Sequence, residues 1–439
     1  MLTARGRKAA RRRVTALAAA ALSGALLLTA CGGSESGSSG GDGKTLKLWH
    51  YEAPNSAMGQ AWNEAIKEFE AKHPGVQVEY EEKSFAQMQK TAQMVLNSSD
   101  APDLMEYNKG NATAGLLSKQ GLLTDLTPEA TKRGWDKKLS AGVRTTSVYD
   151  TDGVMGSGKW YGVPNYAEYT MVFYNKDLFA QYKIPEPKTF DELTAAMDKF
   201  AAKGITPLAN GGAEYPAQQY LYQLALSKAD RAWVDAFELY KGKVDFHDAA
   251  WTYAAETFAD WVRKGYFGKS STGANAEQTG LSFLQGKSPV LFSGSWWYGR
   301  FEDEATFDWG TSLWPDSNLT LGSGGNLWVV PKGAKNKELA YDFIDITLSK
   351  KIQNLLGNKG GVPIAADASA VTEPKAKTLI DNFNTLSQRD GLAFYPDWPV
   401  AGFYDVLVSE TQKLLTGSSK PDDYLDALQK AYDKDAPKQ

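Results

Sequence analysis

The sequence predicts an α/β protein of two lobes, and three observations support this fold class. Its 439 residues exceed what a single hydrophobic core ordinarily organises. Strand-like segments alternate with amphipathic helical segments from residue 45 to residue 107, which is the pattern of a mostly parallel sheet flanked by helices. A β-prone stretch at 159–177 combines several aromatic residues with a carboxylate, Glu168. This combination indicates a strand that crosses between two lobes and lines the cleft between them.

The N-terminal region predicts an export signal, a lipid attachment site and a tether. Basic residues followed by an apolar run form a secretory signal peptide over residues 1–30. The residues Leu28-Thr29-Ala30-Cys31 resemble the lipobox of bacterial lipoproteins, in which the cysteine carries the lipid. The stretch 31–43 is then the lipidated Cys31 and a flexible Gly/Ser tether. We therefore expect a protein anchored at the outer face of the bacterial cytoplasmic membrane, exported by the Sec pathway or, given Arg12-Arg13, by the twin-arginine pathway.

Composition argues against several classes of function. Residues 1–30 hold six of the 48 basic residues and none of the 52 acidic ones, so the remainder is acidic and nucleic acid is not expected as a partner. Cys31 is the only cysteine and the three histidines are far apart, so no metal site is predicted. The sequence has no glycine-rich nucleotide loop of the GxGxxG or Walker type, and we expect no cofactor.

The first third of the chain alternates between strands and helices. Strands are predicted at 45–49, 76–80 and 103–107, with helices at 56–73 and 85–96 between them. In such sheets ligands bind beyond the carboxyl ends of the strands. This rule places the following side chains near one rim: His50, Tyr51, Glu52, Tyr107 and Asn108.

The crossing stretch and the segments after it supply further elements. A turn at Gly162-Val163-Pro164 leads into a strand at 170–174, and Asn175 is a good helix N-cap. Helical spacing then covers these ranges: 189–203, 216–227, 229–240, 248–264, 276–285 and 337–356. The buried strand 289–292 opens into a Ser-Gly-Ser bend that presents Trp296 and Trp297, and a glycine-rich turn precedes the strand 327–331.

Five segments occur in an order that is typical of one family. They are TLKLWHYE, APDLMEYN, YGVPNYAEYTMVFYNKDLF, FLQGKSPVLFSGSWW and GGNLWVVPKGAKNKELAYDFI, the last with GGVP after it. In this the chain resembles the extracellular solute-binding proteins of ABC importers, specifically the carbohydrate-binding family that includes maltose-binding protein. The resemblance covers nearly all of the chain after the tether.

The resemblance implies the two-lobed fold of periplasmic binding proteins, in which each lobe is a mostly parallel sheet flanked by helices and the lobes close around the ligand. On this basis we expect lobe 1 to comprise residues 44–168 and 293–347. Lobe 2 is then expected to comprise residues 169–292 and 348–439.

The resemblance also implies roles for individual residues. Glu168 matches a sugar-binding acid, and Trp296 matches a stacking tryptophan. Tyr404 approximately matches an aromatic residue, with Trp398 as its rival. The first loop differs from maltose binders, which have an Asp-Lys pair where this chain has His50-Tyr51-Glu52, so maltose itself is not specifically predicted. The complete expected ligand-binding set is His50, Tyr51, Glu52, Tyr107, Asn108, Glu168, Tyr169, Trp296, Trp297, Gly325, Asn326, Trp398 and Tyr404.

We therefore expect a monomeric, non-enzymatic receptor that captures a mono- or oligosaccharide and passes it to the transmembrane subunits of an ABC permease. Two alternatives stay open from the sequence. A cationic solute such as a polyamine would also suit a cage of acids and aromatic rings. A secreted carbohydrate-active enzyme would need two facing carboxylates, for which the candidates are Glu52, Glu168 and Asp397.

Overall fold

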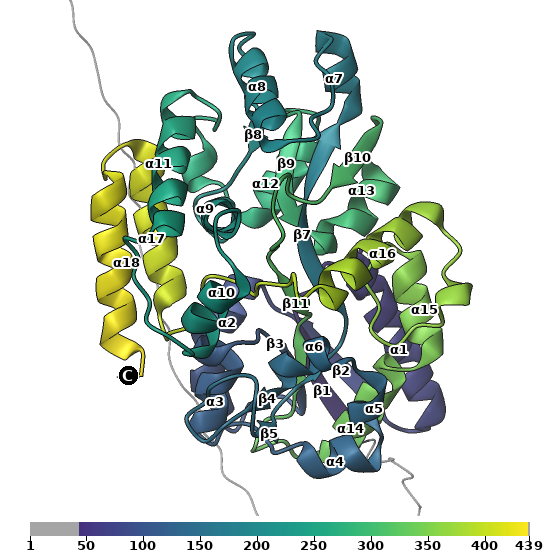
Figure 1. Cartoon of the computed structure of the whole chain (residues 1–439). Coiled ribbons are helices and arrows are strands. Elements are labelled where there is room, and N and C mark those ends of the chain that lie inside the picture. Colours follow the sequence, from purple (N-terminus) through teal and green to yellow (C-terminus); the bar gives the residue numbers. More distant parts are fainter. Residues whose placement is uncertain (1–43, 438–439) are drawn as a thin grey trace, which may run out of the picture. The chain divides into compact units, whose positions relative to one another are not determined.

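The computed structural model describes residues 44–437, and two β-sheets organise this part of the chain (Figure 1). The predicted signal peptide, Cys31 and the tether lie outside the described residues. The first sheet has the strand order β2-β1-β3-β12-β6. Its strands are β1 (Thr45–His50), β2 (Gln77–Glu82), β3 (Leu104–Tyr107), β6 (Val163–Pro164) and β12 (Leu327–Val329). β1 pairs in parallel with β2 and β3, whereas β12 is antiparallel to both of its neighbours.

The second sheet is built around β7 (Ala167–Asn175), whose nine residues are all buried. Its strand order is β10-β7-β9-β8, and β11 also pairs with β7. The partner strands are β8 (Leu208–Ala209), β9 (Val290–Gly294), β10 (Trp309–Ser312) and β11 (Gly322–Gly324). A separate two-stranded ribbon joins β4 (Val148–Tyr149) and β5 (Lys159–Trp160).

The predicted crossing strand is present. Residues 163–164 pair with β12 in the first sheet, and the chain then continues directly into β7 of the second sheet. The passage β11–β12 makes the reverse crossing beside it, because β11 pairs with β7 and β12 belongs to the first sheet. At the end of β7 the Asn175 side chain caps the next helix by accepting the N–H of Leu178 at 3.1 Å, as predicted.

Helices flank both sheets. In the first lobe, defined here as the first sheet and its helices, the principal ones are α1 (Ala57–Lys72), α2 (Phe85–Leu96), α14 (Lys337–Thr347) and α15 (Lys350–Asn358). Shorter ones are α3 (Leu116–Lys119), α4 (Thr127–Lys132), α5 (Trp135–Lys138) and α6 (Ala141–Arg144).

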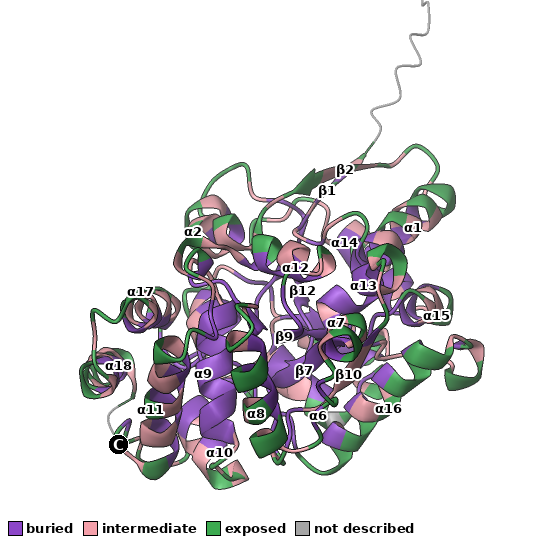
Figure 2. Cartoon of the chain, turned by 90° about the horizontal axis from the view of Figure 1, so that it is seen from above, coloured by how far each residue is buried: buried purple, intermediate pink, exposed green. Residues whose placement is uncertain are grey.

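In the second lobe, defined as the second sheet and its helices, the helices are α7 (Lys176–Tyr182), α8 (Phe190–Ala201), α9 (Pro216–Leu226), α10 (Arg231–Leu239), α11 (Ala249–Arg263), α12 (Ala276–Leu284), α13 (Tyr298–Glu304), α17 (Phe403–Thr416) and α18 (Pro421–Asp435). α16 (Pro374–Gln388) contacts both α15 and β7. All residues of α9 are buried, since it packs against α11, α17 and β9 (Figure 2). The hydrophobic core of this lobe is therefore centred on one helix and the strands beside it.

The two-lobed α/β fold is confirmed, but three details of the prediction are corrected. Both sheets are of mixed orientation rather than mostly parallel, because β7 and β12 run antiparallel to their partners. The predicted lobe boundaries also differ from the strand pairing. The range 293–347 was predicted for lobe 1, but it holds the end of β9 together with β10 and β11, and all three strands pair with β7 in the second sheet. The range 348–439 was predicted for lobe 2, but α15 within it packs on α1 in the first lobe.

The third correction concerns the helix predicted at 337–356, which is two helices. The first ends at Thr347. Ser349 caps the second, because its hydroxyl accepts the N–H of Ile352 at 3.3 Å. Within residues 44–437, no helix is both long enough and apolar enough to cross a membrane.

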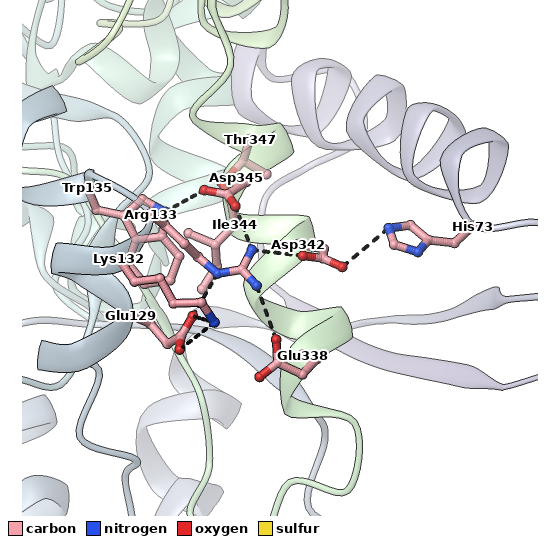
Figure 3. Close-up of polar contacts among 10 residues, drawn as sticks. All are labelled: His73, Glu129, Lys132, Arg133, Trp135, Glu338, Asp342, Ile344, Asp345 and Thr347. Atoms are coloured by element: carbon pink, nitrogen blue, oxygen red, sulfur yellow. Dashed lines mark hydrogen bonds and ion pairs between the residues drawn. The ribbon is translucent and has the colours of Figure 1, made fainter.

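An arginine at the end of α4 joins two elements of the first lobe (Figure 3). The guanidinium of Arg133 pairs with Glu129 of its own helix at 2.8 Å. It also reaches three acids of α14, which share one helix face because of their spacing: Glu338 at 3.2 Å, Asp342 at 2.8 Å and Asp345 at 2.6 Å. Because the Arg133 side chain is only 14% exposed, these ion pairs are partly shielded from water.

Replacing this guanidinium is predicted to weaken the first lobe. Arg133→Met keeps an apolar stem but leaves Asp342 and Asp345 facing each other without their shared cation, and we expect a loss of about 2 kcal/mol in unfolding free energy, measured by denaturant titration. Lys132→Met is the matched control, because that lysine pairs with the same Glu129 while being 62% exposed, and its loss should stay within about 0.5 kcal/mol. Equal losses in both variants would contradict this view of Arg133.

Candidate functional site

A cavity of about 520 Å³ lies between the two lobes. The first lobe contributes the loops that follow β1, β2 and β3, together with Asn326 ahead of β12. The start of β7 supplies Glu168. The second lobe contributes the N-terminal ends of α9 and α12, the turn η4 (Ser295–Trp297), the loop 395–398 and Tyr404 near the start of α17. The cavity is thus assembled from segments that are far apart in the sequence.

Most of the residues expected at the site line this cavity. They are Tyr51, Glu52, Asn108, Glu168, Trp296, Trp297, Asn326, Trp398 and Tyr404. Local structure places several of them. Ser56 caps α1 by accepting the N–H of Gly59 at 2.9 Å, which ends the loop that carries Tyr51 and Glu52. Gly294 allows the Trp296 ring to lie against the end of β9, because a Cβ at that position would lie 1.9 Å from the ring.

Four expected residues lie outside the cavity. His50 is buried beneath it, and its ring stacks on Tyr80 with a centroid distance of 4.2 Å. Tyr107 is buried as the last residue of β3, one position before Asn108. Tyr169 lies on the opposite face of β7 from Glu168, because neighbouring strand residues alternate. The Tyr169 hydroxyl donates to the Leu379 carbonyl at 3.0 Å.

The fourth is Gly325, which has a packing role. Its N–H donates to the Tyr166 carbonyl at 2.6 Å, and a Cβ at this position would lie 2.6 Å from the same oxygen. Only a residue without a side chain fits this close approach of the two chain segments.

Sequence reasoning missed several residues that line the cavity. The most informative are Lys109, Tyr166, Phe85, Tyr215 and Tyr395. Asp397, which the sequence offered as a candidate acid but not in the expected ligand-binding set, also lines the cavity. Lys109 follows Asn108 at the end of β3, so the strand-end rule could have found it. Tyr215 begins a helix and Tyr395 lies in a loop, and no local pattern distinguishes either from an ordinary surface or core aromatic residue.

A network of charged and polar side chains forms the floor of the cavity. The Lys109 ammonium makes an ion pair with Oε1 of Glu168 and donates to Oδ1 of Asn326 at 3.1 Å. The hydroxyl of Tyr166 donates to Oε2 of Glu168 at 3.1 Å. The Asn326 amide donates to this hydroxyl at 2.9 Å and to Oε1 of Glu52 at 3.3 Å. Each of these five side chains therefore has at least one fixed polar partner.

The floor carries more acid than base. Glu106 lies fully buried behind Glu52 and accepts from the Asn165 amide at 2.7 Å. Burial, and then the charge of Glu168, raise the pKa of Glu52 to about 7, while burial raises the pKa of Asp397 to about 6. Burial and the neighbouring Glu52 also raise the pKa of Glu106 well above its usual range. Burial, and then the proximity of other carboxylates, make full ionisation of this floor unfavourable.

Aromatic rings form a continuous wall around the floor. Phe85 of the first lobe lies edge-on to Tyr215 of the second, with centroids 5.9 Å apart. The ring centroids of Tyr215 and Trp296 lie 5.9 Å apart, and those of Trp296 and Tyr395 lie 6.4 Å apart. Trp398 completes the series at 5.3 Å from Tyr395. Because Phe85 comes from α2 and the other rings do not, the wall bridges the two lobes.

Further contacts link the lobes at the other rim. Arg300 of α13 pairs with Glu277 at 2.9 Å and with Glu304 at 3.2 Å. Glu304 in turn accepts from the Asn55 amide of the first lobe at 2.6 Å. The lobes are therefore joined by an aromatic contact, Phe85–Tyr215, and by a polar contact, Asn55–Glu304.

This arrangement suits a ligand with both apolar faces and many hydroxyl groups. Flat aromatic faces hold the apolar parts of a ligand, and a few fixed polar groups orient it. The hydroxyls of Tyr51 and Tyr404 make no hydrogen bond within the described residues and add to these polar groups. Among residues 44–437, no group of three or more His, Cys, Asp or Glu side chains is arranged to hold a metal ion.

Comparisons with known proteins give a consistent result. The family described as bacterial extracellular solute-binding protein matches residues 53–354. The chain is 24% identical over 369 residues to a maltotriose-binding protein of Pyrococcus abyssi, covering 79% of this chain and 72% of the relative. It is 26% identical over 349 residues to a diacetylchitobiose binding protein of Streptomyces coelicolor, covering 76% and 77%. A solved structure of a chitin oligosaccharide binding protein has the same fold, with a TM-score of 0.77 and 24% identity, covering 90% of this chain and 99% of that one.

The raised pKa of Glu52 predicts a pH-dependent stability for the ligand-free protein. Between its ordinary value of 4.5 and about 7, the folded protein binds more protons at this group than the unfolded chain, so this group makes stability fall as pH rises. Glu52→Gln cannot ionise at this position and therefore lacks that loss. The unfolding free energy of the variant minus that of the intact protein should then be roughly 2–3 kcal/mol larger at pH 8 than at pH 4.5.

Denaturant titrations at the two pH values measure this difference. Glu82→Gln is the control, because it removes a negative charge from the same cavity at an exposed position. A constant difference in unfolding free energy between Glu52→Gln and the intact protein at both pH values would contradict the raised pKa of Glu52.

Proposed function

Because the chain belongs to the bacterial extracellular solute-binding proteins, we propose that it captures a neutral oligosaccharide in the cavity between its lobes and delivers it to an ABC permease. The observation that carries this proposal is the combination of a wall of aromatic rings with a hydrogen-bonding floor in one cavity that both lobes line. Relatives whose names state a maltotriose or diacetylchitobiose ligand support an oligosaccharide as the class of ligand.

The chemistry of sugars fits the two parts of the cavity. A pyranose ring presents C–H groups on its faces, which pack against aromatic rings such as Trp296. Its hydroxyls both donate and accept, so they can pair with carboxylate, ammonium and amide groups. In this proposal Glu168 accepts from sugar hydroxyls and the Lys109 ammonium donates to them. The Asn326 amide can donate to or accept from hydroxyls of the same ring.

Closure of the lobes follows from where the groups lie. A ligand that contacts Trp296 of the second lobe and Asn326 of the first favours the conformation in which both surfaces are close. The ligand shifts the equilibrium between open and closed forms only by its difference in affinity for them. The closed form is then the one that the permease recognises.

The two alternatives receive less support from the site. A polyamine would have to compete with the internal ammonium of Lys109 for Glu168. For glycoside hydrolysis a proton-donating carboxylic acid must face a second carboxylate across the substrate bond. Glu168 is instead held by Lys109 and by the Tyr166 hydroxyl, which favours a binding role without covalent chemistry.

The location also remains part of the proposal. The family is extracellular, and the sequence Leu28-Thr29-Ala30-Cys31 supports attachment by lipid at Cys31, followed by a tether that holds the lobes near the membrane. Labelling of intact cells with a lipid precursor tests this step: Cys31→Ser should abolish the label and release the protein into the medium.

Truncating the central aromatic side chain tests the proposed function. Trp296→Ala should weaken oligosaccharide binding roughly tenfold to a hundredfold, because a stacking face worth about 1–3 kcal/mol is lost. Isothermal titration with an oligosaccharide chosen from a panel of malto-, chito-, xylo- and cello-oligosaccharides measures the affinity.

Two control variants separate stacking from general damage. Trp296→Phe keeps an aromatic face and should lose less affinity than Trp296→Ala. Tyr253→Ala removes a half-buried aromatic side chain from α11, outside this cavity, and should leave the affinity unchanged. An unchanged affinity in Trp296→Ala would overturn the proposed binding mode.

A further inference from the structure

We propose that Lys109 determines the charge specificity of the cavity: its ammonium occupies the position where the cation of a ligand would otherwise bind, and it thereby restricts the cavity to neutral ligands. This inference rests on the proposed function and deepens it. It concerns a residue outside the set that the sequence predicted, and it depends on the surroundings of a single nitrogen atom.

The partners of this nitrogen are those of a cation site. Its ion pair with Glu168 is nearly free of water, since the side chains of Lys109 and Glu168 are 3% and 5% exposed. The Asn326 carbonyl oxygen lies at 3.1 Å. Two aromatic rings face the same ammonium, with centroids at 5.5 Å for Tyr395 and 5.4 Å for Trp398. A carboxylate, an amide oxygen and two rings are the groups that commonly enclose a bound ammonium ligand.

In this protein the lysine completes that enclosure from within the chain. A ligand ammonium at the same rings would lie beside the Lys109 charge in a poorly hydrated space, where repulsion between like charges is strong. A sugar hydroxyl meets no such penalty, because it can donate to Glu168 and accept from the ammonium. The Lys109 ammonium therefore repels a cationic ligand, whereas the ammonium and the Glu168 carboxylate together favour a neutral polyol.

The other cations that line the cavity do not replace Lys109 in this role. Lys83 pairs with Glu81 and lies over the Trp49 ring at 4.5 Å, on the side of the first lobe. Arg300 is held by Glu277 and Glu304 at the rim. Without Lys109, the Glu168 carboxylate would lose the cation that pairs with it beside the two rings.

The test compares the affinities of the intact protein and of Lys109→Met for two probes. One probe is spermidine, and the other is the neutral oligosaccharide that the intact protein binds in the panel described above. We expect Lys109→Met to bind spermidine at least tenfold more tightly than the intact protein, and to lose affinity for the neutral oligosaccharide. The ratio of the two affinities should thus shift toward the cation by more than a hundredfold.

Matched variants connect this shift to the proposed geometry. Lys83→Met removes a lysine from the same cavity and should leave the ratio of the spermidine and oligosaccharide affinities unchanged. The double variant Lys109→Met with Glu168→Gln should not gain affinity for spermidine, because the carboxylate that would bind the ligand's cation is gone. Lys109→Gln, which retains a polar group, serves in place of Lys109→Met if the latter fails to fold, as judged by circular dichroism.

The outcomes distinguish a failure of the proposed function from a failure of the role proposed for Lys109. If the intact protein binds no neutral oligosaccharide, the proposed function fails irrespective of Lys109. If the intact protein binds the sugar while the folded Lys109 variants show no gain for spermidine, only the role of Lys109 is overturned. An equal gain in Lys83→Met would also overturn it, because the effect would then reflect the net charge of the cavity alone.

Discussion

The ammonium of Lys109 and the carboxylate of Glu168 lie almost wholly out of water, so each depends on the other. Either charge alone in this position would cost several kcal/mol in lost hydration, whereas together they are compensated by attraction and by the hydrogen bonds from Tyr166 and to Asn326. The two residues lie at the end of β3 and the start of β7. The pair therefore fixes how the first sheet meets the strand that leads into the second, and it sets the floor from which the cavity is built.

This constraint explains why the two lobes make different contributions. The first lobe and the crossing strand supply the polar floor, while the second lobe supplies most of the aromatic wall through Tyr215, Trp296 and Tyr395. A ligand that needs both surfaces must contact both lobes, which couples binding to closure. Phe85 is the exception, since it extends the wall from the first lobe to Tyr215. It provides an apolar contact between the lobes.

Alternation, caps and strand ends are local features, and they predicted the alternating strands and helices, the crossing strand and side chains such as Tyr51, Glu52 and Asn108. Trp296, Trp398 and Tyr404 were predicted from the resemblance to a known family, and they also line the cavity. The sequence could not divide the lobes, since the pairing of β10 with β7 joins residues more than a hundred positions apart. Strand alternation places Glu168 and Tyr169 on opposite faces of β7, so only Glu168 of these two predicted residues lines the cavity. Tyr215 and Tyr395 escaped prediction because only tertiary packing brings them beside Trp296.

A crystal structure of the protein with the oligosaccharide that it binds most tightly tests the central claim most directly. The account predicts a sugar ring packed on Trp296 at about 4 Å, with hydroxyl oxygens within about 3 Å of Glu168, Lys109 or Asn326. The Lys109–Glu168 pair should remain intact in that complex. A sugar bound outside the cavity, or inside it with Lys109 displaced from Glu168, would contradict the account.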